Sequence, residues 1–207
     1  LKTSVGFGGS CFQKDILNLV YLCHHFGLPE VANFWEEVVT LNEWHQHRIS
    51  NLIIKKLFGT ISGKKIAILG FAFKANTNDT RESAAISICK DLIEEGALLS
   101  IHDPKVDPLQ VRKDLGIDEK NKEELEIINN LIPSNGEWFF SESIQYALEG
   151  ADAAIILTEW KDYQLIDWNK MSNFMRRPSW VFDARSTLDP EQVKKSGLNY
   201  WRIGDGS

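Results

Sequence analysis

The 207-residue sequence predicts an α/β protein, with a helical N-terminal segment that contains one long helix, followed by a doubly wound parallel sheet. Two observations carry this prediction. Residues 15–58 repeat their apolar side chains every three or four positions, which is typical of amphipathic helices. After Gly63, short apolar runs alternate with helical patterns, which is typical of buried parallel strands joined by helices. This change of pattern divides the chain into residues 1–60 and 61–207.

The helical segment is interrupted once, at Gly27-Leu28-Pro29, where glycine ends one helix and proline begins the next. The second helix is predicted to span roughly 28 residues, or about 42 Å. Such a helix either packs on its own domain, or joins two domains or two copies of the chain, and the sequence leaves both possibilities open. Its apolar positions form a stripe of Val31, Phe34, Trp35, Val38, Leu41, Ile49, Leu52 and Ile53.

The second part is predicted to be a Rossmann-like sheet, whose ligands bind beyond the carboxyl ends of the strands. Polar residues 107–135 are predicted to form a helical excursion with an exposed loop. Ser141 and Asp189 are predicted to cap the last two helices. The predicted strands are 65–70, 98–102, 153–157, 180–182 and 200–203, and the predicted helices are 83–95, 141–148 and 190–195.

Composition argues against several kinds of partner. The net charge is −6 and no basic block is present, so neither nucleic acid nor an anionic membrane is expected as a partner. No apolar run reaches the roughly 20 residues that cross a bilayer, and no signal peptide is recognisable, so a soluble, cytoplasmic protein is expected. Cys23 and Cys89 lie on helical stripes and are predicted to be buried. Cysteine and histidine spacing indicates neither disulfides nor a metal site.

The stretch V-G-F-G-G-S-C-F-Q-K-D, residues 5–15, combines pliable backbone with reactive side chains. Its three glycines let a ligand approach the backbone closely. Cys11 follows near the start of a predicted helix, with Lys14 nearby, and both features favour the thiolate. Cys11 is therefore a candidate nucleophile, and Asp15 is the nearest candidate for proton transfer.

Charged residues also follow three predicted strands. The loop after the first strand carries Lys74 and Arg81 near a helix N-terminus, which favours an anionic ligand, although a solvated polar loop is the alternative. This loop lacks the G-x-G-x-x-G of a dinucleotide site. Asp103 stands where related sheets bind a ribose hydroxyl, but aspartate before proline is also a common turn former. Asp183 and Arg185 form a charged pair at another strand end, for which a surface ion pair is the alternative.

These segments resemble the UDP-glucose 6-dehydrogenases of the UDP-glucose/GDP-mannose dehydrogenase family. The resemblance rests on G-F-G-G-S-C-F-Q-K-D and G-F-A-F-K-A-N-T-N-D-T-R-E-S, with D-P-K, L-T-E-W and F-D-A-R following in the family's order. It implies NAD-dependent oxidation of UDP-glucose to UDP-glucuronate, through a thiohemiacetal and a thioester on the motif cysteine. It also implies self-association through the long helix, and a UDP-sugar-binding domain at 61–207.

The resemblance implies roles for individual residues. Cys11 matches the nucleophile, Asp15 the acid/base or water-positioning group, and Lys14 a catalytic-motif lysine close to the NAD cofactor. Arg81 matches an arginine that reaches the cofactor. The residues that match substrate-binding positions are Lys2, Ser4, Val5, Gly6, Phe7, Gly8, Phe73, Lys74 and Arg185.

The sequence departs from the family pattern in two places. The chain starts just upstream of the cysteine motif and carries no dinucleotide fingerprint, so the isolated chain is expected to be an inactive portion of an active enzyme. Ser186 follows Arg185 where the animal enzymes tend to carry a second arginine. The alternatives are a GDP-mannose or UDP-N-acetylmannosamine dehydrogenase, or a non-catalytic nucleotide-binding or oligomerisation module. The F-Q after Cys11 favours UDP-glucose.

Overall fold

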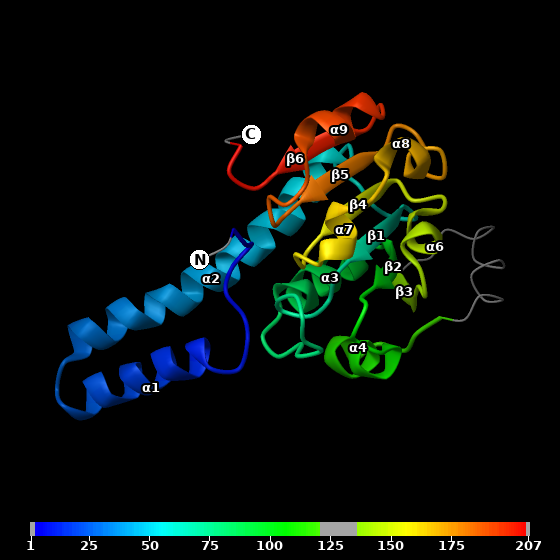
Figure 1. Ribbon diagram of the computed structural model, residues 1–207. Helices are drawn as coiled ribbons and strands as arrows, with labels where there is room; N and C mark the ends of the chain where they lie inside the picture. Colours follow the sequence, from blue (N-terminus) through cyan, green and yellow to red (C-terminus); the bar gives the residue numbers. More distant parts are fainter. Residues whose placement is uncertain (1–2, 121–135, 206–207) are drawn as a thin grey trace.

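The computed structural model describes residues 3–120 and 136–205, which form a two-helix hairpin and a parallel sheet flanked by helices (Figure 1). The predicted site residue Lys2 lies outside the described residues, as does the second half of the excursion predicted at 107–135. The described half contains α4 (Pro108–Leu115), which begins at the capping side chain of Asp107. The helical part of this prediction is therefore confirmed over the described residues.

Two antiparallel helices form the hairpin, α1 (Phe12–His25) and α2 (Pro29–Lys56). α2 contains 28 residues, as the sequence predicts. In the turn between them, Gly27 has a φ of 72°, a left-handed conformation that glycine adopts at little cost. The helices are held together by a cluster of buried apolar residues, Ile16, Val20, Cys23, Ala32 and Val39. The hairpin therefore has a small core of its own and projects away from the sheet (Figure 1).

α2 continues from the hairpin to the sheet, and its two halves are buried to different extents. Ile49 and Ile53, in the second half, are fully buried in the main core, where α2 packs against α3 (Ala84–Glu94). Phe34 and Leu41, in the first half, are 65% and 62% exposed. The predicted apolar stripe is therefore not buried along its whole length, because α1 covers only part of the first half. α2 links the hairpin to the sheet.

The six strands of the described sheet are all parallel, in the order β3-β2-β1-β4-β5-β6. This doubly wound order confirms the predicted fold class. Five strands agree with predicted apolar runs to within one residue at each end, whereas β3 was not predicted because its four residues follow a long polar segment. The strands are β1 (Lys65–Leu69), β2 (Leu98–His102), β3 (Glu137–Phe140), β4 (Ala153–Ile156), β5 (Trp180–Asp183) and β6 (Asn199–Arg202).

The remaining helices connect these strands, and one predicted cap is wrong. Asp189 caps the helix after β5 as predicted. Ser143, not Ser141, caps the helix after β3, because Ser141 is buried and hydrogen-bonded to Ser100 at 2.6 Å. α7 and α8 were not predicted, because four residues are too few to show a helical period. These helices are α6 (Ile144–Leu148), α7 (Lys161–Gln164), α8 (Trp168–Met171) and α9 (Pro190–Lys195).

The strand order fixes where a ligand site can form. β1 lies between β2 and β4, and the chain moves from β1 to β2 on one side but from β4 to β5 on the other. In doubly wound sheets this reversal opens a crevice at the carboxyl ends of the two central strands. The loops that follow β1, β2, β4 and β5 therefore surround the expected ligand position.

Candidate active site

The segment that leads to Cys11, residues 3–11, is here called the cysteine loop. It begins at the sheet, because the Ser4 hydroxyl accepts a 2.6 Å hydrogen bond from the Arg185 guanidinium just after β5. The side chain of Val5 is only 1% exposed and belongs to the main core. A ligand contact at Val5 would therefore have to involve its backbone.

The middle of the cysteine loop lies directly against the loop between β1 and α3, residues 70–83, here called the β1–α3 loop. A Cβ atom on Gly8 would lie 2.2 Å from the Glu82 carbonyl oxygen, and one on Gly9 would lie 2.9 Å from the Phe73 ring. The Gly9 N–H also donates to the Arg81 carbonyl oxygen at 2.9 Å. Glycine is required here because two backbones approach closely. The two longest motifs of the sequence are thus brought together.

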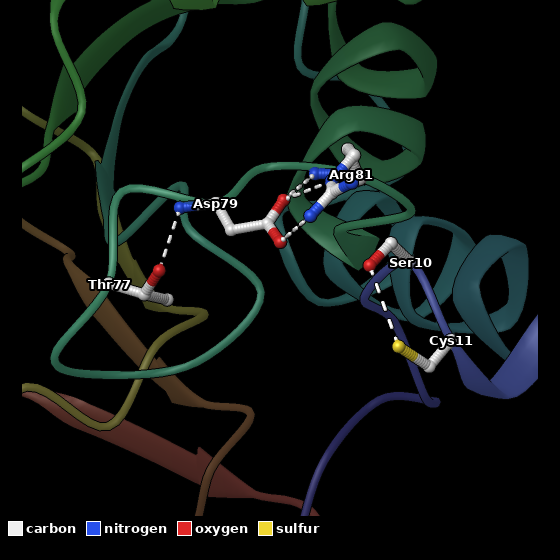
Figure 2. A network of polar contacts seen from close by, with 5 residues as sticks. All are labelled: Ser10, Cys11, Thr77, Asp79 and Arg81. Carbon is white, nitrogen blue, oxygen red and sulfur yellow. Dashed lines mark hydrogen bonds and ion pairs between the residues drawn. The ribbon is translucent and has the colours of Figure 1, made fainter.

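Cys11 is exposed at the junction between the cysteine loop and α1. Its thiol lies 3.7 Å from the Ser10 hydroxyl, and Figure 2 shows it on the side of the cysteine loop that faces the β1–α3 loop. Lys14 and Asp15 are exposed in the first turn of α1. The three residues predicted to carry catalysis therefore lie within little more than one helical turn, accessible to a ligand.

Arg81 of the β1–α3 loop lies near this thiol, with its guanidinium turned toward Asp79 (Figure 2). Its guanidinium pairs with Asp79 at two points, Nε with Oδ1 at 2.9 Å and Nη2 with Oδ2 at 2.7 Å. The hydrogen bond from Arg81 lowers the pKa of Asp79. The same bond raises the pKa of Arg81, as does the charge of Asp79, with a smaller contribution from Cys11. Arg81 is therefore held in place and lies close enough to Cys11 to interact electrostatically.

Lys74 supplies a second cation from the same β1–α3 loop. It is exposed, and its Nζ lies 5.2 Å from the centroid of the Phe73 ring, within reach of a cation–π interaction. Phe73 in turn lies against Gly9 of the cysteine loop. Lys74 and Arg81 are thus carried by a loop that contacts the cysteine loop directly, an arrangement suited to an anionic ligand such as a diphosphate.

Buried side chains hold the β1–α3 loop to the ends of β2 and β4, a role that the sequence did not indicate for them. The Asp103 carboxylate accepts hydrogen bonds from Phe71 N at 2.8 Å, Ala72 N at 3.1 Å and the Trp160 indole at 3.1 Å. The Thr158 hydroxyl donates to the Ala72 carbonyl at 2.6 Å. Asp103 also caps its own turn, so its oxygens are occupied within the chain. This geometry supports a turn-forming role for Asp103 rather than the binding of a ribose hydroxyl.

Arg185 and Asp183 do not form the surface ion pair considered from the sequence. Asp183 is fully buried and accepts backbone hydrogen bonds from Thr187 and Leu188, both at 2.8 Å. Arg185 pairs instead with Glu159, and both side chains are 8% exposed. Burial lowers the pKa of Arg185, partly offset by the charge of Glu159. Its Nε is buried without a hydrogen bond among the described atoms, whereas its two terminal nitrogens bond to Ser4 and Glu159.

Comparison with known proteins agrees with this geometry. The model of the UDP-glucose/GDP-mannose dehydrogenase family, UDP binding domain, matches residues 67–190, and the model of the central domain of the same family matches residues 1–44. The chain belongs to this family. Both matches fall on the segments that form the site, since the first includes the β1–α3 loop and the second includes the cysteine loop.

Relatives within the family match nearly the whole chain. UDP-glucose 6-dehydrogenase 2 of Oryza sativa subsp. japonica is 43% identical over 99% of this chain and 42% of its own length. UDP-glucose 6-dehydrogenase of Drosophila melanogaster is 45% identical over 99% of this chain and 41% of its own length. A solved structure of a UDP-glucose dehydrogenase from Pyrobaculum islandicum has a TM-score of 0.67 and 25% identity, over 96% of this chain and 38% of that one. The chain thus spans less than half the length of these family members.

The structure brings most of the predicted site residues to one region of the family's fold. Contacts across the site join Ser4 to Arg185, and the glycines of the cysteine loop to Phe73 and Arg81. Ser186 has a left-handed φ of 54°, in the turn after β5. Among the described residues, no three histidine, cysteine, aspartate or glutamate side chains are grouped so that they could hold a metal ion.

Proposed function

We propose that the protein containing this chain oxidises UDP-glucose to UDP-glucuronate with NAD. The observation that carries the proposal is the exposed Cys11 at the start of α1, near Arg81 of the β1–α3 loop, in a chain of the UDP-glucose/GDP-mannose dehydrogenase family. The named relatives in rice and fruit fly, both UDP-glucose 6-dehydrogenases, support UDP-glucose as the substrate.

The described residues fit the chemistry of such a ligand. Lys74 and Arg81 are exposed cations that can pair with the diphosphate of a nucleotide sugar. Arg81 and Lys14 are the residues of this chain that would contact NAD. When bound, NAD supplies a hydride acceptor for each of the two oxidations.

Within this proposal, Cys11 carries the covalent steps. Its sulfur adds to the aldehyde carbon of the oxidised sugar: the C–S bond forms, the carbon–oxygen π bond opens, and the proton lost from the thiol is balanced by protonation of that oxygen, which gives a thiohemiacetal. Loss of a hydride from that carbon, for which NAD would be the acceptor, and of the hydroxyl proton to solvent or a base gives a thioester. Water then attacks the thioester carbon, the C–S bond breaks, and the carboxylate product leaves Cys11 ready to react again. Asp15 lies one helical turn from Cys11 on α1 and can orient or deprotonate this water.

Two alternatives have different expected behaviour. GDP-mannose or UDP-N-acetylmannosamine would use the same cysteine chemistry, and rates with the three nucleotide sugars would distinguish these substrates. A non-catalytic nucleotide-binding or oligomerisation module would show no turnover with any of them. The exposed positions of Cys11, Lys14 and Asp15 favour catalysis, because a module without chemistry has no use for an accessible thiol beside two charged side chains.

We also propose the division into residues 1–60, with the cysteine loop and central helices, and residues 61–207, with the UDP-sugar-binding sheet. Self-association through α2 is part of this proposal, supported by the exposure of Phe34, Leu41 and Trp44. Leu41→Glu should lower the mass measured by sedimentation, whereas Leu109→Glu, at a leucine on α4 that is also exposed, should not. An unchanged mass in Leu41→Glu would contradict this assembly.

Among the described residues, no helix has both the length and the apolar composition needed to cross a membrane. The cytoplasmic location expected from the sequence stays a prediction.

The experiment that tests the activity is the substitution Cys11→Ser in a protein that joins this chain to a dinucleotide-binding domain. Overall formation of NADH from UDP-glucose should fall by more than about a hundredfold, because serine is a far weaker nucleophile at neutral pH. The control is Cys23→Ala, which removes a thiol that is buried between α1 and α2. Turnover that survives Cys11→Ser would remove Cys11 from the mechanism.

A further inference from the structure

Asn42, in the middle of α2, is a buried polar residue whose side chain bonds to the cysteine loop. It is 8% exposed. Its Oδ1 accepts a 2.8 Å hydrogen bond from the Phe7 N–H, and its Nδ2 donates to the Phe7 carbonyl oxygen at 3.1 Å. One amide side chain thus satisfies both backbone groups of a loop residue, as a neighbouring strand would. Sequence reasoning treated this part of α2 only as an apolar stripe.

The backbone before Phe7 is shaped to let Asn42 approach. Gly6 has a φ of 135°, which side chains rarely adopt, and a Cβ atom there would lie 2.5 Å from Asn42 Oδ1. The same Cβ would lie 3.4 Å from the amide nitrogen of Gln46, the next buried polar residue of α2. The first glycine of the motif therefore serves the contact with α2, whereas the two later ones serve the contact with the β1–α3 loop.

Asn42 fixes one end of the short segment that carries the thiol. Three residues separate Phe7 from Cys11 along the chain, and the Phe7 ring packs edge-on against Phe12 at 4.7 Å between centroids. The other support of the segment is the hydrogen bond from Gly9 to the Arg81 carbonyl. The segment is thus held between the helix and the β1–α3 loop. Loss of the Asn42 contact removes both hydrogen bonds of the Phe7 backbone and leaves Phe7 held by its side chain alone, which packs against Phe12 and the apolar cluster of the hairpin.

We infer that Asn42 is a positioning residue, which holds the cysteine loop so that the Cys11 thiol lies near Arg81 of the β1–α3 loop. The inference deepens the proposed function and rests on the role proposed there for Cys11. Asn42 itself does not contact the reacting atoms. It acts through Phe7, and it makes the long helix part of the support of the active site.

The test measures where the thiol lies, without any nucleotide. Cys11 is alkylated with iodoacetate, an anion, and with iodoacetamide, its neutral counterpart; in each reaction the sulfur forms a bond to carbon and iodide leaves. The ratio of the two rates reports the positive charge around Cys11. Cys23 and Cys89 are buried, and peptide mass spectrometry confirms that the label is on Cys11. The variants are Asn42→Leu, which keeps most of the volume, and Asn42→Ala; the control is Asn51→Leu, at an exposed asparagine on the same helix.

In Asn42→Leu and Asn42→Ala, the iodoacetate-to-iodoacetamide ratio should fall by about twofold or more, the effect of one unit charge several ångströms away through water. Asn51→Leu should leave the ratio unchanged. A ratio that stays the same in a folded Asn42 variant overturns the inference, because Asn42 would then only contribute to packing.

A second measurement covers the case in which neither Asn42 variant folds. In the unsubstituted chain, hydrogen exchange at the Phe7 amide should be slowed at least about tenfold relative to the unfolded chain, because Asn42 accepts that hydrogen. Exchange at the unfolded rate overturns the inference by itself. Neither measurement needs NAD or UDP-glucose. If the protein is not a dehydrogenase, NADH formation fails while both measurements still show the effect of Asn42. If Asn42 does not position the loop, these two measurements fail whatever the activity is.

Discussion

Substitution of Asp103 by asparagine should destabilise the protein although the two side chains have the same shape. The Oδ2 atom of Asp103 accepts from the Phe71 and Ala72 backbone and from the Trp160 indole. The Oδ1 atom accepts from the backbone of Lys105 at 2.9 Å and of Val106 at 3.1 Å. All five partners are donors, and a carboxylate can accept from all of them.

An asparagine offers one accepting oxygen and one donating NH₂ group. Of its two possible orientations, the one that keeps more hydrogen bonds places the oxygen at the Phe71, Ala72 and Trp160 donors. The NH₂ group then faces the N–H groups of Lys105 and Val106. Each buried donor that loses its acceptor costs about 1–3 kcal/mol. The Val106 N–H is buried and the Lys105 N–H only partly so, which together give a loss of about 3 kcal/mol in the free energy of unfolding. For a chain of this size that corresponds to a fall in Tm of about 6–12 °C.

Thermal unfolding followed by circular dichroism measures this loss, and the same substitution four residues later provides the control. Asp107 caps α4 by accepting from the Gln110 N–H on the surface, and asparagine caps helices about as well as aspartate. Asp107→Asn should therefore change the free energy of unfolding by no more than about 0.5 kcal/mol. Equal small effects of both substitutions would show that the Asp103 contacts do not hold the β1–α3 loop.

Three further predictions concern the site. Gly8→Ala should lower the free energy of unfolding by about 1–3 kcal/mol, because its Cβ would lie 2.2 Å from the Glu82 carbonyl oxygen, whereas Gly116→Ala, at a left-handed position in open space, should lower it by about 1 kcal/mol. Chemical denaturation measures both losses, and a loss at Gly8 no larger than that at Gly116 would contradict the close approach. In the folded chain, a thiol reagent should modify Cys11 alone, since burial raises the pKa of Cys89 and encloses Cys23; equal labelling of all three before urea is added would contradict this burial. The 207-residue chain alone should not reduce NAD with UDP-glucose, because it lacks a G-x-G-x-x-G segment, and any NADH formed would refute that expectation.

The fold was predictable where the local pattern carries the information. The buried strands β1 and β2 are continuous apolar runs, and α2 shows a clear helical period between its proline and its end. β3 was missed because pairing with β2, rather than any pattern of its own, makes its four residues a strand. The cap of α6 was misassigned because two serines lie close together, and only the burial of Ser141 against Ser100 distinguishes them.

The site was predictable only in part, because its contacts cross the sequence. Arg185 and Asp183 are neighbours along the chain, yet Arg185 pairs with Glu159 after β4 and with Ser4 in the cysteine loop. These partners come together only when the carboxyl ends of β4 and β5 meet at one edge of the sheet. The position of Asp183 at the end of a strand, directly before a turn, could have indicated that it caps the turn. In the structure its carboxylate accepts a hydrogen bond from the Leu188 N–H of that turn.

Burial separates two kinds of residue that the motifs do not distinguish. Asp103 and Thr158 are buried and fully engaged by the chain, so they determine the shape of the β1–α3 loop. Lys14, Lys74 and Arg81 are exposed and contribute little to folding, because substitutions of surface charges usually change stability by no more than about 0.5 kcal/mol. Substitutions in the first group should therefore lower stability and displace the loop, whereas those in the second should weaken the binding of an anionic ligand and leave the fold unchanged. If the substitution of Lys14 or Lys74 unfolded the chain, this distinction would be wrong, because removing an exposed cation leaves no buried group without its hydrogen-bond partner.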